Sequence, residues 1–297
     1  MPTLSMDALE MNAMSQEIKE TKKSSGKAPK TINELIEQLH NSPSEKDRYN
    51  AARMLGEMGD SSAVEPLIDS LKNDKNGSAR LYAARALGEL GDIRAVEPLI
   101  ESLRLDKNVD VRVRAARALG RLGGEDVVLP LVEALSDSNS QVCMTAADAL
   151  IEIGPISVKP LIEILKHDKV NVRCDATRAL GELGDKRAVD ALVDMLKDEW
   201  VNVRIYAVQS LGKIAEKSAV PALIEVMQNS DENDLVRAGA AASLGVLRDP
   251  RALMPLRALI MESNDLNEVA DTALKAFKLI MSASWKGNAP QSATSKK

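Results

Sequence analysis

The feature that most constrains this chain is a ten-residue string that recurs at steps of 30 to 33 residues. Its copies are AARMLGEMGD (51–60), AARALGELGD (83–92), AARALGRLGG (115–124), AADALIEIGP (146–155), ATRALGELGD (176–185), AVQSLGKIAE (207–216) and AAASLGVLRD (240–249). A second string alternates with it, from AVEPLIDSL (63–71) to ALMPLRALI (252–260). Units this short cannot bury an apolar face alone, so they must stack on one another. The repeat predicts eight stacked units, at roughly 31–59, 61–91, 93–123, 126–154, 156–184, 186–215, 217–248 and 250–281.

Each unit has the apolar spacing of two helices. In the first helix, Val64, Leu67 and Leu71 fall three or four residues apart, as on one buried helical face. The second helix repeats that spacing with alanines, which let backbones approach closely. We expect the recurrent prolines to open the first helix or bend it near its start. The residues expected to cap second helices at their N-termini are Ser78, Asp110, Asn171 and Asn202. Glycines stand where second helices should end in a left-handed residue: Gly59, Gly91, Gly123, Gly154 and Gly184.

Composition indicates many thin contacts rather than one thick core. Hydrophobic residues make up 44% of the chain, yet it holds only two Trp, three Tyr and one Phe. A single large core normally relies on aromatic bulk, so here Ala, Leu, Val and Ile must fill the interior. Tetratricopeptide repeats need several aromatics per unit, and ankyrin repeats need a T-P-L-H element that is absent. Both classes are therefore excluded.

The pattern D-x-x-V-R-x-x-A-A-x-A-L-G, seen in DVRVRAARALG (110–120) and NVRCDATRALG (171–181), resembles the short HEAT-like repeats of the phycobilisome-lyase type. The resemblance implies an all-α fold, a right-handed α-solenoid of about eight helix pairs, with the second helix of each pair lining the concave face. We place the solenoid at residues 31–281. Residues 1–30 form an N-terminal extension, either a short helix and linker or a disordered tail, and residues 282–297 form a disordered C-terminal tail.

Charge and cysteine usage exclude several classes. A net charge of −5 argues against a nucleic-acid binder, whose affinity comes mainly from Lys and Arg. Two cysteines cannot form a disulfide framework, which favours a reducing compartment. No stretch approaches the ~18 consecutive apolar residues of a membrane span, and the first 30 residues lack a signal-peptide core. We expect a cytoplasmic protein with no membrane or nucleic-acid partner.

Candidate catalytic residues are few. The chain has two histidines, His40 and His167, each at the expected end of a first helix. Some HEAT-like proteins are di-iron hydroxylases that bind metal through repeated His-Glu pairs, but here Asn41 and Asp168 follow the histidines. Two thiols without further ligands make a poor zinc site. The sequence therefore predicts no catalytic residue, no cofactor and no metal, and favours a non-enzymatic protein.

The arginine of the V-R pair recurs in nearly every unit, which indicates architecture rather than specificity. We expect a ladder in which each arginine pairs with an acidic residue of the preceding inter-helix loop, namely Asp74, Asp106, Asp168 or Asp198. Cys143 replaces the arginine in the fourth unit, so the ladder should weaken there. The arginines are Arg48, Arg80, Arg112, Arg173, Arg204 and Arg237.

The positions that vary between units are the candidates for binding. Numbering each second helix from the valine of V-R as position 1, positions 3, 4, 7 and 11 face away from the buried positions 1, 5, 8, 9 and 12. All three tyrosines and a row of arginines fall there, and Tyr and Arg dominate binding hot spots. The predicted partner-binding residues are Tyr49, Arg53, Tyr82, Arg85, Arg114, Arg117, Arg121, Arg178 and Tyr206.

Two interpretations of this face remain open. It could bind an acidic protein or peptide, which would make the chain an interaction scaffold that uses its concave face. It could instead be a solvated, self-neutralised face, because Arg53–Glu57, Arg85–Glu89 and Arg178–Glu182 are spaced as helical ion pairs. By resemblance alone, the alternatives are a subunit of a bilin chromophore lyase and a HEAT-like oxidoreductase that lacks the usual metal pairs.

Overall fold

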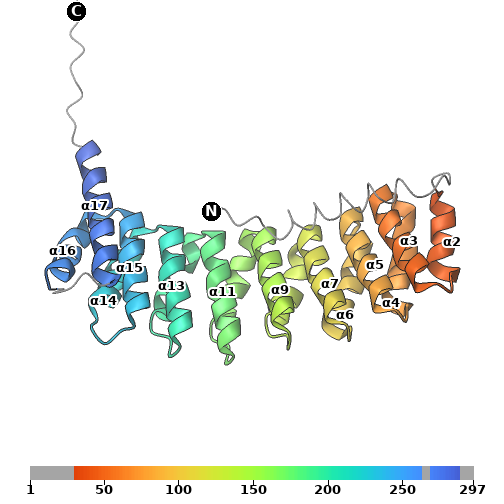
Figure 1. The fold of residues 1–297 in the computed structure, drawn as a ribbon, viewed down its shortest axis with the longest axis horizontal. Helices are drawn as coiled ribbons and strands as arrows, with labels where there is room; N and C mark the ends of the chain where they lie inside the picture. Colours follow the sequence, from red (N-terminus) through yellow and green to blue (C-terminus); the bar gives the residue numbers. More distant parts are fainter. Residues whose placement is uncertain (1–29, 263–267, 288–297) are drawn as a thin grey trace, which may run out of the picture.

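The computed structural model describes residues 30–262 and 268–287, and in these residues all regular secondary structure is helical. The helices follow one another as eight pairs ranged along an elongated rod (Figure 1). The protein is thus an all-α solenoid, as predicted. The pairs are α2 (Ile32–Asn41) and α3 (Glu45–Met58), α4 (Val64–Asn73) and α5 (Gly77–Leu90), α6 (Val96–Leu105) and α7 (Val109–Leu122), α8 (Val128–Ala134) and α9 (Ser140–Ile153), α10 (Val158–Ile164) and α11 (Val170–Leu183), α12 (Val189–Met195) and α13 (Val201–Ile214), α14 (Val220–Gln228) and α15 (Asp234–Leu247), and α16 (Leu253–Glu262) and α17 (Glu268–Gly287).

The ends of the chain correct one predicted boundary. Helix α17 continues past residue 281 to Gly287, so the tail predicted from residue 282 begins too early. The reason is that the sequence after residue 281 holds no helix breaker before Gly287. Residues 1–29 and 288–297, which include the predicted N-terminal helix, lie outside the described residues.

A short 3₁₀ turn leads into each first helix from the second unit on. In the second unit it spans Ser61–Ala63, and the Asp60 side chain accepts a hydrogen bond from the Ser62 N–H at its start. Helix α4 follows at once, so Pro66 lies in its first turn rather than at its first residue. Proline is tolerated there because the N–H groups of the first turn lack partners within the helix.

Second helices end at the predicted glycines but begin earlier than predicted. Gly59, Gly91 and Gly184 are left-handed, whereas Gly123 and Gly154 combine a positive φ with ψ values of −165° and −146°. Gly59 ends α3 with a φ of 71°, in the left-handed region. The predicted N-caps are wrong by two residues, because Asn76 rather than Ser78 caps α5, and Asn108 rather than Asp110 caps α7. Likewise, Lys169 and Trp200, not Asn171 and Asn202, stand at the N-cap positions of α11 and α13. An asparagine oxygen just before the first turn reaches the N–H groups of that turn, whereas a residue inside the turn does not.

The interior is built from Ala, Leu and Val, and successive second helices come very close together. A Cβ added to Gly56 on α3 would lie 2.8 Å from the Cβ of Ala86 on α5. A Cβ added to Gly88 on α5 would lie 2.7 Å from that of Ala118 on α7. The glycine at position 10 is therefore needed for close approach. Neighbouring first helices pack against each other much less extensively than neighbouring second helices.

The arginine ladder exists, but it points the other way from the prediction. Arg48 Nε lies 2.7 Å from Asp74 Oδ2, so the arginine pairs with the loop of the following unit and not with its own. Its Nη1 donates to the backbone oxygen of Ser42 in its own loop, which ties the two loops together. The same pairing recurs in Arg80–Asp106, Arg112–Asp137, Arg173–Asp198 and Arg204–Glu232. The ladder therefore staples unit to unit.

Candidate binding face

All nine predicted binding residues lie on second helices, and none of them is fully buried. Eight are partly exposed and Arg121 is exposed. Tyr49 and Arg53 lie on α3, Tyr82 and Arg85 on α5, Arg114, Arg117 and Arg121 on α7, Arg178 on α11, and Tyr206 on α13.

The tyrosines of the first two units stack on each other. The ring centroids of Tyr49 and Tyr82 are 5.3 Å apart, with an interplanar angle of 20°. Such offset aromatic pairs add about 0.5–1.5 kcal/mol beyond the area they bury. The stack places both rings against each other at the surface of α3 and α5.

Two of the three expected helical ion pairs form. Arg53 Nη1 lies 2.6 Å from Glu57 Oε1, and Arg85 Nε lies 2.8 Å from Glu89 Oε1. The third is wrong, because Arg178 reaches across to Asp148 on α9, at 3.1 Å.

The reason is that the fourth unit carries aspartate at position 7, where the first three units carry arginine. Asp148 on the preceding second helix, α9, therefore offers Arg178 a carboxylate partner, which the arginines at position 7 of the earlier units lack. Glu182 pairs instead with Lys213 of the following unit.

A groove of about 1170 Å³ opens on this face at the fourth, fifth and sixth units. Hollows at the ladder steps of the first three units measure about 330 Å³ each. The groove walls combine apolar side chains (Met144, Ile205 and Tyr206), charged ones (Asp148, Asp175 and Arg178) and both cysteines.

The groove follows from a change in helix packing. Position 10 of α9 is Ile151, whereas α3, α5, α7, α11, α13 and α15 all carry glycine there. In the other units the position-10 glycine lies close to the next second helix, and a branched isoleucine side chain at that position needs more room between the two backbones. Helices α9 and α11 accordingly pack less extensively than any other consecutive pair of second helices in the described residues.

The ladder is also interrupted at this seam. Cys143 stands in place of the arginine, and its Sγ donates to the backbone oxygen of Asp137 at 3.3 Å. Asp168, which an arginine there would reach, is left exposed. Lys169 Nζ bridges the seam instead, to the backbone oxygen of Ser136 at 2.9 Å.

The charged side chains that line the groove are three aspartates (Asp137, Asp148 and Asp175) and two cations (Lys169 and Arg178), so its formal charge is −1. Burial raises the pKa of Asp175, the Arg178 guanidinium opposes that rise, and Asp148 adds to it. Burial and then the Asp175 charge raise the pKa of Cys174 to about 11, and the same two causes raise the pKa of Cys143. Both thiols are therefore protonated at neutral pH and are poor nucleophiles and metal ligands.

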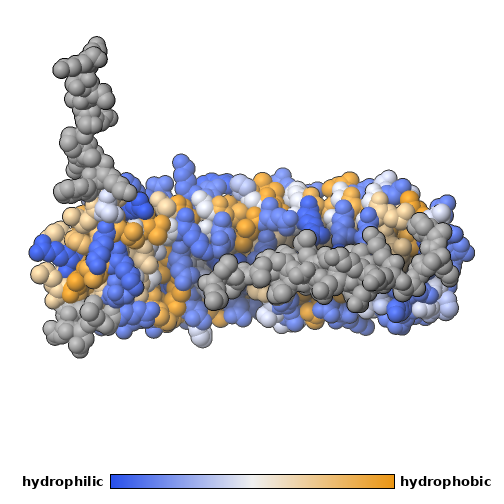
Figure 2. Space-filling view, turned by 45° about the horizontal axis from the view of Figure 1, so that its top comes forward, coloured by the Kyte–Doolittle hydropathy of each residue, from blue (hydrophilic) through white to orange (hydrophobic). Residues whose placement is uncertain are grey.

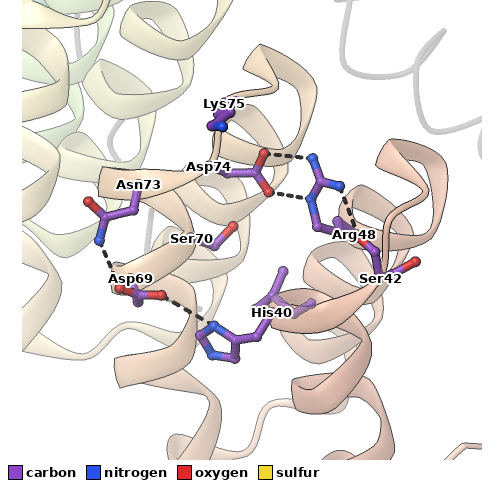
Figure 3. A pocket seen from close by; sticks show the side chains of 9 residues that line it. His40, Ser42, Arg48, Asp69, Ser70, Asn73, Asp74 and Lys75 are labelled. Carbon is purple, nitrogen blue, oxygen red and sulfur yellow. Dashed lines mark hydrogen bonds and ion pairs between the residues drawn. The ribbon is translucent and has the colours of Figure 1, made fainter.

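The two histidines lie near helix ends, as expected. His40 Nδ1 lies 3.2 Å from Asp69 Oδ2, beside the Arg48–Asp74 pair (Figure 3). His167 Nδ1 accepts a hydrogen bond from the Lys169 N–H. In the described part of the chain, no three His, Cys, Asp or Glu side chains gather in a way that could hold a metal ion. None of the helices described is both long and apolar enough to cross a membrane.

Comparison with known proteins identifies the repeat. HEAT repeats match residues 32–108, 96–160, 155–202 and 197–278 of this chain. No curated protein matches this sequence significantly.

Three solved structures illustrate the likeness. Escherichia coli YibA is 22% identical over 94% of this chain and 98% of its own, with a TM-score of 0.51. Importin beta is 14% identical over 84% of this chain and 41% of its own, with a TM-score of 0.60. The CpcE–CpcF complex of phycocyanin lyase from Nostoc sp. PCC7120 is 26% identical over 87% of this chain and 97% of that chain, with a TM-score of 0.45. The first two likenesses concern the fold.

Proposed function

The chain belongs to the HEAT repeat family, and from that premise we propose that it is a non-enzymatic scaffold that grips an acidic protein or peptide along the face of its second helices. The observation that carries the proposal is the Tyr49–Tyr82 stack, which lies on the same face as the arginine row of the first three units. A preorganised surface of this kind avoids part of the ordering cost of binding.

Helix packing supports the choice of this face. The close approach at Gly56 and Gly88 draws second helices together, while first helices pack less extensively. In a curved stack, the more closely spaced row lies on the inner side. The second-helix face would then be the concave one, which surrounds a bound chain on more sides than a convex face does.

The acidic character of the partner follows from the first three units. Position 7 of their second helices is Arg53, Arg85 and Arg117, and Arg114 lies one turn earlier on α7. Arginine forms bidentate hydrogen bonds with carboxylates. The glutamates at position 11 already hold Arg53 and Arg85 in place, so a carboxylate-bearing partner would meet positioned guanidinium groups.

The test is a paired affinity capture from the native cell lysate. One bait is the wild-type chain and the other carries Tyr82→Ala and Arg117→Ala. A third bait carries Lys72→Ala and Arg104→Ala, which remove exposed charges from first helices. Circular dichroism confirms equal helicity of all three.

We expect an acidic protein that the wild-type and third baits retain and the second loses, with binding weakened at least tenfold when that protein is purified. Equal capture by all three baits would refute the use of this face.

A further inference from the structure

The groove between α9 and α11 carries a more specific inference, which rests on the proposed function. We propose that it receives a lysine or arginine side chain of the partner, with an apolar residue beside it. The partner would then be a peptide segment in which a cationic anchor follows or precedes an acidic stretch. The acidic stretch lies on the first three units and the anchor at the fourth to sixth.

The charges in the groove call for a cation. Asp175 is half-buried, and within the described residues no donor makes a hydrogen bond to its carboxylate. Asp148 lies on the opposite wall and shares Arg178 with it. One guanidinium thus serves two carboxylates. A half-buried carboxylate without a donor is costly unless a partner supplies one, and an ammonium or guanidinium group does so with a charge.

The other walls suit the stem of such a side chain. Met144 is 45% exposed at the groove, and Ile205 and Tyr206 line the far wall from α13. Lys and Arg pack their methylene stems along apolar surface while the charged head reaches a polar group. The groove volume of about 1170 Å³ exceeds the roughly 300–1,000 Å³ of a pocket for a drug-sized ligand. It therefore has room for the anchor and one apolar neighbour.

The sign of the face changes along the rod, which would fix the register of the partner. Position 7 is arginine in the first three units, Asp148 in the fourth and Arg178 in the fifth, so the sign reverses at the fourth unit alone. A peptide with a uniform negative charge would meet repulsion at Asp148 and Asp175, so a charge of opposite sign is needed there. Figure 2 shows hydrophilic and hydrophobic residues intermixed on the visible surface of the rod.

The experiment uses the full chain and two phage-displayed libraries of random dodecapeptides, one of which excludes Lys and Arg. Selected peptides are labelled with fluorescein, and their affinities are measured by fluorescence anisotropy. The test variant is Asp175→Asn, which keeps the shape of the groove and removes its charge. The matched control is Glu182→Gln, a carboxylate on the same helix α11 that does not line the groove. Arg117→Ala reports on the arginine face.

We expect peptides only from the library that contains Lys and Arg, with one conserved cation beside an apolar residue. Asp175→Asn should weaken binding about tenfold or more, as loss of a hydrogen bond to a charged group does. Glu182→Gln should change it less than twofold. Replacing the cation of the peptide by alanine should cost no further affinity in the Asp175→Asn variant.

A second variant tests the shape of the groove. Ile151→Gly restores the glycine of the other units and should let α9 and α11 close together, which also weakens binding. Peptides that respond to Arg117→Ala but not to Asp175→Asn would overturn the cation pocket and leave the proposed function standing. Peptides that respond to Asp175→Asn alone would do the reverse. Selecting no peptide from either library would overturn both.

Discussion

Replacing Gly88 by alanine has two opposite effects on the free energy of unfolding, a gain in helix propensity and a loss from steric overpacking. In an exposed helix interior this change stabilises by about 1 kcal/mol, because glycine has the more flexible backbone. Here the new Cβ would lie 2.7 Å from the Cβ of Ala118 and 2.9 Å from its Cα. Carbon atoms pack best at about 3.5–4.0 Å, so α5 and α7 would have to move apart. Overpacking of this kind costs about 1–3 kcal/mol.

We therefore expect Gly88→Ala to lower the free energy of unfolding by about 0–2 kcal/mol, measured by urea titration with circular dichroism. The exposed Ala242→Gly on α15 gives the helix-propensity effect alone and should cost about 1 kcal/mol. Combining Gly88→Ala with Ala118→Gly should recover part of the loss, because one of the clashing carbons is removed. A rise in stability of about 1 kcal/mol for Gly88→Ala would refute the close-approach argument.

Three further outcomes follow from the structure. Ala215 ends α13 with a φ of 56°, so Ala215→Gly should raise the free energy of unfolding by about 1 kcal/mol in urea titration. Arg112→Gln leaves the mostly buried Asp137 without its charged partner and should lower the free energy of unfolding by about 3 kcal/mol in the same assay. A change near zero would mean that the arginine ladder does not stabilise the fold. Burial raises the folded-state pKa of Asp175 above 3.8, so protonated Asp175 favours the folded state. Its contribution to the free energy of unfolding is present below 3.8 and is lost as the pH rises through the raised folded-state pKa. Asp175→Asn should therefore raise the thermal midpoint at pH 7 and leave it unchanged at pH 3.5, below the ordinary pKa.

The repeat made most of the fold predictable. Apolar spacing gave the helix pairs, and the glycines after second helices gave their ends, because both are local properties of the chain. The ladder partners were harder to assign, since Asp74 stands both in the loop before Arg80 and in the loop after Arg48. Only the stacking geometry decides that its carboxylate meets Arg48 while its backbone oxygen meets Arg80.

The candidate site was predicted in part. The residues proposed for binding were selected because they vary while their neighbours repeat, and variation is visible in a sequence. A sequence does not show which charged residues of different units come together. The spacing on α11 therefore suggested a pair of Arg178 with Glu182, whereas Arg178 pairs with Asp148. The groove was missed for a similar reason. Its signal was present as the change from A-L-G to A-L-I at Ile151, but its meaning depends on a clash between two helices that only the packed structure shows.

Three departures from the repeat in the fourth unit bear on one place. Cys143 removes the staple to the next unit, Ile151 separates α9 from α11, and Asp148 reverses the charge at position 7. Each alone would weaken a regular seam without an evident gain. Together they open the groove and give it negative charge, while Lys169 keeps the two units tied. The other units show the regular contact between neighbouring units. Three departures from it at one place favour a ligand site over unrelated substitutions. The fourth unit is therefore where contact with the partner should be sought.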